Sequence, residues 1–232
     1  MTQEIKLSTD QMRLMSLFQN ITKATARDCV EDEKQNRIIF VVNEGKMGLA
    51  IGKGGSHIKQ LQNTISKIIS DKGPINILIN NAANAERHAI DDVTEEYWNE
   101  RMNINLRHYF FTVQSVNKSM IENKSGAIVN IGSASWMIGQ GGMAVYTAAK
   151  SGVVGLTRSF ARDLGEFNIR VNSVVPGWTM TKRQIEKWLT PESEKELMKN
   201  QCLKHKLMPS DIAKAVLFFS SEQSSGCTNQ SY

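Results

Sequence analysis

The sequence predicts an α/β protein with a mixed, mostly parallel sheet and helices on both faces of that sheet. Short β-branched runs such as Arg37–Val42 and Ile169–Val174 alternate with longer stretches of helical period. This alternation is typical of parallel strands joined by helices. Small-residue loops follow some of these runs, at the carboxyl ends where an open parallel sheet has its ligand crevice.

The composition describes an ordinary globular chain of 232 residues, 41% hydrophobic and 22% charged. No stretch approaches the ~20 apolar residues needed to cross a bilayer, and the N-terminus lacks the apolar core of a signal peptide. We therefore expect a cytoplasmic protein without a membrane partner. Cys29, Cys202 and Cys227 lack metal-ligand spacing, so reduced thiols and no metal site are expected. The net charge of +5 permits contact with nucleic acid without arguing for it.

The segment Gly126–Lys150 contains the residues most suggestive of chemistry. A β-prone run, Ala127–Ile131, leads into a small-residue loop with Ser133, and a helix with Tyr146 and Lys150 follows. One helical turn separates the tyrosine from the lysine, which places phenol and ammonium on the same face. The ammonium is expected to lower the pKa of Tyr146, as a base working at neutral pH requires. An amphipathic helix with an incidental tyrosine and lysine is the alternative interpretation.

Three further motifs accompany these residues. Asn80–Ala83 reads NNAA, Asn105 stands in NINL, and Val171–Gly177 reads VNSVVPG. In this order the set resembles the short-chain dehydrogenase/reductase family, over about residues 71–232. The resemblance implies a Rossmann-type domain and an NAD(P)-dependent oxidoreductase that acts on an alcohol or a ketone. The polar stretch Lys182–Lys206 resembles the region that covers the substrate in this family.

The same resemblance implies roles for single residues. Tyr146 would be the acid/base, and Lys150 would tune it and hold the nicotinamide ribose. Ser133 would orient the substrate carbonyl, and Asn105 would hold the water of the proton relay. The positions implied to contact the cofactor are Asn81, Ala82, Tyr146, Lys150, Pro176, Gly177, Thr179 and Thr181. Family members pair through helices that correspond to residues 92–124 and 146–165, so a homo-oligomer is expected.

Helix boundaries in this part follow from capping signals. One long helix is predicted from Asp92 or Thr94 to a point before Gly126, and a second continues from Tyr146 to about Gly165. A last helix, Ile212–Ser220, is predicted after a cap at Met208–Asp211.

Residues 1–70 have a different pattern. A helical stretch, Asp10–Thr22, precedes strand-like Thr25–Val30 and Arg37–Val42, and MGLAIGKGG then leads into an amphipathic helix. This order resembles a type II KH domain of the archaeal NusA kind. Glycines let a backbone approach a phosphate closely, and a lysine adds charge. The resemblance implies that single-stranded RNA binds at Gly52, Lys53, Gly54 and Gly55, whereas a plain glycine turn between two helices is the alternative.

Both parts are incomplete relative to the families that they resemble. The KH-like part lacks its own last strand, while residues 71–232 lack the first three strands and have a truncated last strand. The missing portion includes the glycine-rich turn that binds the dinucleotide pyrophosphate, so binding of NAD or NADP is expected to be weak or lost. Gly48, Gly52 and Gly54 have the spacing of that turn and are a candidate replacement.

We predict that the two parts share one sheet, with Ile75–Asn80 serving both. The expected strand order is Thr25–Val30, Arg37–Val42, Ile75–Asn80, Ala127–Ile131 and Ile169–Val174, with the first pair antiparallel and the others parallel. Three functions stay open at this point. They are an oxidoreductase with impaired cofactor binding, an RNA-binding module, and a folded chimera that retains motifs without activity.

Overall fold

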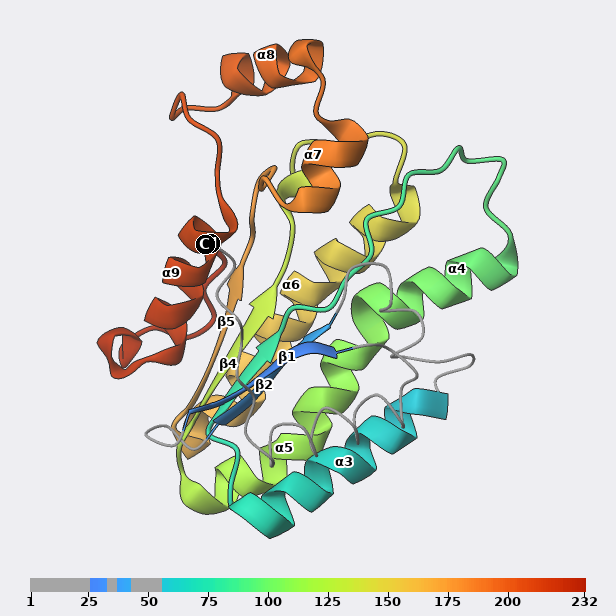
Figure 1. Ribbon diagram of the computed structural model, residues 1–232. Coiled ribbons are helices and arrows are strands. Elements are labelled where there is room, and N and C mark those ends of the chain that lie inside the picture. Colours follow the sequence, from blue (N-terminus) through green and yellow to red (C-terminus); the bar gives the residue numbers. More distant parts are fainter. Residues whose placement is uncertain (1–25, 33–36, 43–55) are drawn as a thin grey trace.

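A computed structural model describes residues 26–32, 37–42 and 56–232 of the chain. A parallel sheet forms its centre. Its strands are β3 (Ile77–Asn80), β4 (Gly126–Ile131) and β5 (Ile169–Val174), in the order β3-β4-β5. Helices lie on both faces of this sheet (Figure 1). The predicted α/β class is therefore confirmed, and the bounds of β5 are those predicted.

The N-terminal strands form a separate sheet. β1 (Ala26–Asp32) and β2 (Arg37–Val42) pair antiparallel, as predicted. The prediction of a single shared sheet is wrong, because the two strands form a two-stranded sheet apart from the parallel one. The helix that precedes β3, α3 (Ser56–Lys72), packs through Ile65 into the core cluster of the parallel sheet. It thus covers part of one face of the parallel sheet and leads into β3. The predicted helix 10–22 and the glycine loop 48–55 lie outside the described residues.

The chain's last residues extend the parallel sheet beyond β5. The amide of Ser173 donates to the carbonyl of Gln230 over 2.8 Å, and the amide of Tyr232 donates to the carbonyl of Ser173 over 3.0 Å. This alternation is that of a parallel ladder. The residues around Ser231 therefore pair with β5 in the parallel direction.

Two helical layers bury the two faces of the parallel sheet. On one face, Ile128 and Val171 pack against α5 (His108–Asn123) and α6 (Ala144–Leu164). On the other face, Val129 packs against Phe219 of α9 (Pro209–Ser220). Because successive side chains of a strand point to opposite faces, neighbouring residues of β4 contact different layers. The carboxyl ends of the strands are thereby held at a fixed position between helices.

The long helix predicted before Gly126 is present but interrupted. It begins at a Thr94 cap, whose hydroxyl accepts from the amide of Tyr97 over 3.1 Å, and continues as α4 (Glu95–Met102). Residues Asn103–Arg107 form a π-helical turn before α5 begins. Such turns frequently occur at functional sites. Here the turn contains Asn105, which is fully buried.

A chain of buried polar side chains joins the strand ends to the helices. Asn80 donates its amide hydrogen to the amide oxygen of Asn130 over 2.9 Å, and Asn130 donates to the hydroxyl of Thr157 on α6 over 2.9 Å. The hydroxyl of Thr112 on α5 in turn donates to the amide oxygen of Asn80 over 2.8 Å. Buried polar groups that are all paired stabilise one arrangement of the surrounding elements. The chain therefore fixes β3 and β4 next to the ends that carry the site.

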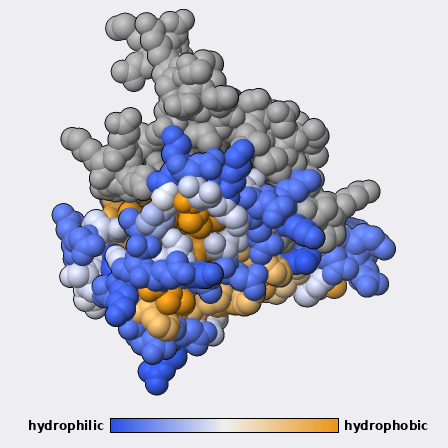
Figure 2. All heavy atoms as spheres, turned by 90° about the horizontal axis from the view of Figure 1, so that it is seen from below, coloured by the Kyte–Doolittle hydropathy of each residue, from blue (hydrophilic) through white to orange (hydrophobic). Residues whose placement is uncertain are grey.

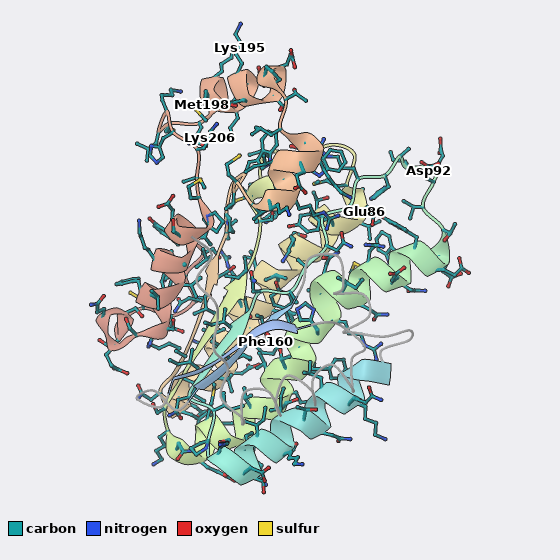
Figure 3. All side chains as sticks on the ribbon, viewed as in Figure 1. Glu86, Asp92, Phe160, Lys195, Met198 and Lys206 are labelled. Carbon is teal, nitrogen blue, oxygen red and sulfur yellow. The ribbon has the colours of Figure 1, made fainter. Side chains whose placement is uncertain are left out.

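Two short helices, α7 (Lys182–Trp188) and α8 (Pro191–Asn200), lie beyond the carboxyl ends of the strands (Figure 1). Lys195 and Met198 of α8 mark the outer end of this region (Figure 3). Viewed from the opposite end, the described surface is mostly hydrophilic, with apolar areas between the polar ones (Figure 2). None of the helices within the described ranges has the length and apolar character required to span a membrane.

Candidate active site

Ser133, Tyr146 and Lys150 come together at the carboxyl end of β4. Ser133 follows the strand, and its hydroxyl accepts from the amide of Ser135 over 3.2 Å. The hydroxyl of Ser133 also faces the phenol of Tyr146, whose pKa it lowers. Tyr146 and Lys150 lie on the first two turns of α6, where the lysine nitrogen is 5.8 Å from the centre of the tyrosine ring. The predicted shared face of phenol and ammonium is thus present.

Lys150 is a buried cation with neutral partners. Its side chain is 1% exposed, and its Nζ donates to the Tyr109 hydroxyl over 2.9 Å and to the Ile131 carbonyl over 2.7 Å. No carboxylate pairs with it among the residues that the structure describes. Burial lowers the pKa of Lys150 to about 7. The amine is therefore only partly protonated near neutral pH.

The pKa of Tyr146 is shifted in the direction opposite to the one predicted. Burial raises the pKa of this phenol, and the hydrogen bond from Ser133 offsets only part of that effect. The predicted lowering of the pKa by the ammonium is wrong here, because desolvation of the phenolate outweighs a partly protonated amine at the observed distance. A phenol that keeps its proton at neutral pH is suited to donate it to a substrate oxygen.

The side chain of Asn105 binds the loop that follows β3. Its amide oxygen accepts from the backbone amide of Asn84 over 2.7 Å, and its amide nitrogen donates to the Asn84 carbonyl over 3.1 Å. The side chain thus holds this loop against the π-helical turn, which packs beside α6. That Asn105 holds the water of a proton relay stays a prediction.

Of the residues predicted to contact the cofactor, Tyr146 and Lys150 lie on α6, and the others lie in loops at the carboxyl ends of the strands. Asn81 and Ala82 directly follow β3, and Pro176 and Gly177 follow β5. The carbonyl of Pro176 accepts from the amide of Ala134 over 2.9 Å, which joins the loops after β4 and β5. Thr179 and Thr181 continue the second loop, and the hydroxyl of Thr181 caps α7. The predicted RNA-binding residues, Gly52–Gly55, lie outside the described residues.

His88 holds the start of the helix that carries Tyr146, and sequence reasoning missed it. Its Nε2 accepts from the amide of Val145 over 3.3 Å, and its Nδ1 donates to the carbonyl of Ala89 over 3.0 Å. A backbone amide can only donate, so the ring must carry its proton on Nδ1. Amides in the first turn of a helix lack partners within the helix, and His88 supplies one. The contact spans 57 residues of sequence, so no local motif announces it.

The region predicted to cover the substrate is fastened to the loop after β3. The guanidinium of Arg183 on α7 donates to the side-chain oxygen of Asn84 over 3.2 Å. The guanidinium of Arg87 lies 4.5 Å from the ring centre of Trp188, a cation–π contact. Asn84 therefore links Asn105 to α7, a role that the NNAA motif before it did not indicate.

Comparison with known families divides the chain into two overlapping parts. Residues 56–232 match the sequence model of the family described as "Enoyl-(Acyl carrier protein) reductase". Residues 13–87 match the model described as "KH domain". The first match begins at residue 56 rather than near 71, so α3 and β3 fall in both matches.

Individual relatives of the second part are dehydrogenases. The D-xylose 1-dehydrogenase of Caulobacter vibrioides is 45% identical over 168 residues, which are 72% of this chain and 67% of that protein. The "Probable galactose dehydrogenase GalD" of Rhizobium meliloti is 38% identical over 174 residues, 75% of this chain and 68% of that protein.

A solved structure with the same fold is a gluconate 5-dehydrogenase from Burkholderia cenocepacia in complex with NADP and tartrate. Its TM-score is 0.71 and its identity 26%, with 75% of this chain and 68% of that chain covered. The chain thus spans about two thirds of the length of these relatives. The family match, the fold and the arrangement of Ser133, Tyr146 and Lys150 agree with one another. Through residues 56–232, the chain belongs to the short-chain dehydrogenase/reductase family.

Proposed function

We propose that the chain is an NAD(P)-dependent oxidoreductase that acts on an alcohol or carbonyl group of a sugar-like substrate. The observation that carries this proposal is the cluster of Ser133, Tyr146 and Lys150 at the carboxyl end of β4. The names of the related xylose, galactose and gluconate dehydrogenases support a polyhydroxylated substrate. A cytoplasmic location is part of the proposal.

The described residues fit the nicotinamide half of the cofactor. Lys150 uses two of its three N–H groups on Tyr109 and Ile131, and the third has no partner among the described residues, as a ribose hydroxyl requires. The loops at 81–82 and 176–181 would hold the rest of this half. A nicotinamide bound there supplies or accepts the hydride.

The protein groups move and hold the proton. Tyr146, which retains its proton at neutral pH, donates it to the carbonyl oxygen during reduction and becomes a phenolate. Oxidation is the reverse step, in which the phenolate takes the proton of the alcohol. Ser133 holds the same oxygen by a hydrogen bond. The pKa of Lys150 is about 7, so this side chain can gain or lose a proton beside Tyr146 at physiological pH.

We propose that cofactor affinity is weakened, because the family's three amino-terminal strands and their glycine-rich turn are absent from the part of the chain that matches. That turn holds the pyrophosphate and the adenosine half in Rossmann folds. The candidate replacement at Gly48, Gly52 and Gly54 stays a prediction. Residues 1–70 and 71–232 are the proposed domains, with α3 crossing near their boundary.

Titration with reduced cofactors tests this function. NADH and NADPH are added to the purified chain while their fluorescence is followed, and reduced nicotinamide mononucleotide, which lacks the adenosine half, is titrated in parallel. We expect binding in the millimolar range, with the mononucleotide within a few fold of the dinucleotides, because only the nicotinamide half is held. No binding of any of the three at millimolar concentration would contradict the oxidoreductase function. A dinucleotide preference of a hundredfold or more would show an intact pyrophosphate site.

Single-stranded RNA binding is a second candidate function, favoured by the KH family match over residues 13–87. Fluorescence anisotropy with labelled short RNA tests it. Replacing Lys53 and Gly54 by aspartate should abolish binding, because the loop would repel phosphate. Lys59→Asp, at an exposed position on α3, is the matched control and should weaken binding only slightly. Equal binding by the wild type and the loop variant would remove Gly52–Gly55 as the RNA site.

The third possibility is a folded chimera without activity. It predicts cooperative thermal unfolding together with no response to cofactor or to RNA. Under all three functions we propose that two copies pair through residues 92–124 and 146–165. Trp98 and Phe110 on these helices, 43% and 42% exposed, support such pairing.

A further inference from the structure

We propose that Tyr109 is a positioning residue for Lys150, whose ammonium it fixes at the carboxyl end of β4. Tyr109 lies in the first turn of α5 and is 0% exposed. It is not among the site residues that the sequence motifs indicate. The effect of Tyr109 on catalysis rests on the proposed oxidoreductase function. The hydrogen bond between Tyr109 and Lys150 is independent of that function.

Three polar groups form a closed triangle between α5, α6 and β4. The Tyr109 hydroxyl donates to the Ile131 carbonyl over 2.8 Å, and Lys150 Nζ donates to the same carbonyl over 2.7 Å. Lys150 Nζ also donates to the Tyr109 hydroxyl over 2.9 Å. An ammonium has no lone pair, so the single phenolic hydrogen must point to the carbonyl. The lone pairs of the phenol are therefore turned toward the lysine.

This triangle explains how a long, flexible side chain keeps one position. A lysine has a four-carbon stem with free rotation, and here no carboxylate from the described residues anchors it. Two acceptors from two different elements leave the third N–H with a defined direction. A buried charge needs such hydrogen bonds, since water does not replace them.

The other groups that face the triangle are neutral. His108 lies beside Tyr109, with ring centres 4.3 Å apart, and its side chain is buried. Burial, with a contribution from Lys150, lowers the pKa of His108 to about 3. Burial raises the pKa of Tyr109 well above its usual value and raises that of Tyr146. Lys150 is therefore the group of this cluster that gains or loses charge around neutral pH.

The test measures the protonation of Lys150 directly and needs neither cofactor nor turnover. Lysines labelled with ¹³C at Cε and ¹⁵N at Nζ are titrated by NMR in the full chain, and Lys150→Arg assigns the signal. In Tyr109→Phe we expect the proton affinity of Lys150 to fall by roughly tenfold, because the protonated form loses one of its two acceptors. Tyr97→Phe is the matched control, since the Tyr97 hydroxyl is also buried but has no hydrogen-bond partner among the residues that the structure describes, and it should leave the titration unchanged.

The outcomes separate this proposal from the oxidoreductase function. An unchanged Lys150 titration in folded Tyr109→Phe would overturn the positioning role, whether or not the chain binds NADH. If this variant does not fold, ¹⁵Nζ relaxation of Lys150 in the wild type decides. A rigid ammonium is expected from the triangle, and a freely reorienting one would overturn it. Where turnover is measurable, the pH profile of kcat/KM should shift in Tyr109→Phe in the same direction as the NMR titration.

Discussion

Tyr146→Phe should lower the turnover of any alcohol or ketone substrate by about 10²–10⁴-fold, the range that a positioned acid or base contributes. The substitution removes the hydroxyl that exchanges a proton with the substrate oxygen and keeps the aromatic ring. Ser133 retains a partner, since its hydroxyl also donates to that of Ser135 over 3.0 Å. Affinity for NADH and thermal stability should therefore change little.

Steady-state rates and a cofactor titration on the same preparation check this expectation. Tyr97→Phe again serves as the matched control, because it removes a buried hydroxyl but keeps the ring that contacts His88. Rates in the control should stay within about twofold of the wild type. Turnover that survives Tyr146→Phe would mean that another group moves the proton.

Lys150→Met is expected to stabilise the fold while removing activity. Burial lowers the pKa of this lysine from 10.5 to about 7, so the folded state disfavours its charged form. Methionine carries no charge and fills similar space. The Ile131 carbonyl keeps the Tyr109 hydroxyl as donor, so no buried acceptor is orphaned. We expect the free energy of unfolding at pH 7 to rise by on the order of 3 kcal/mol.

The stabilisation expected from Lys150→Met should depend on pH. Between about pH 7 and 10.5 the unfolded chain binds more protons at this lysine than the folded chain does, so wild-type stability should increase with pH over that interval. Below pH 7 both states are protonated and the full cost of burial applies. The difference between Lys150→Met and the wild type should therefore shrink as pH rises from 7 to 10.

Urea unfolding at several pH values measures this difference. Lys118→Met is the control, because the Lys118 side chain is 87% exposed and its removal should change stability by less than about 0.5 kcal/mol at every pH. A loss of stability in Lys150→Met at pH 7 would show that the hydrogen bonds of the ammonium outweigh its desolvation.

Local sequence patterns were sufficient to predict most elements of the described residues. The β-branched runs fixed β2 and β5 to the residue, and the caps at Thr94 and Met208–Asp211 are where predicted. Periodicity reports which face of an element is apolar, and capping residues act on their own helix, so both effects are readable within one element.

Contacts between segments that are distant in the sequence could not be predicted from local patterns. No local pattern indicates that β1 and β2 form a sheet apart from β3. Tyr109 lies 41 residues from Lys150, and His88 lies 57 residues from Val145. The sign of the Tyr146 pKa shift was missed for a related reason. It depends on how deeply α6 is buried, which the spacing of tyrosine and lysine does not express.

The π-helical turn at Asn103–Arg107 has a geometric consequence for the helices on either side. A π turn holds more residues than an α turn, so the apolar stripe of α5 does not continue in phase along α4. Buried residues of α5 include Tyr109, Val113 and Val116, whereas α4 has none. Removing one residue from the turn would restore a continuous stripe, at the expense of rotating Asn105 away from the loop that it holds.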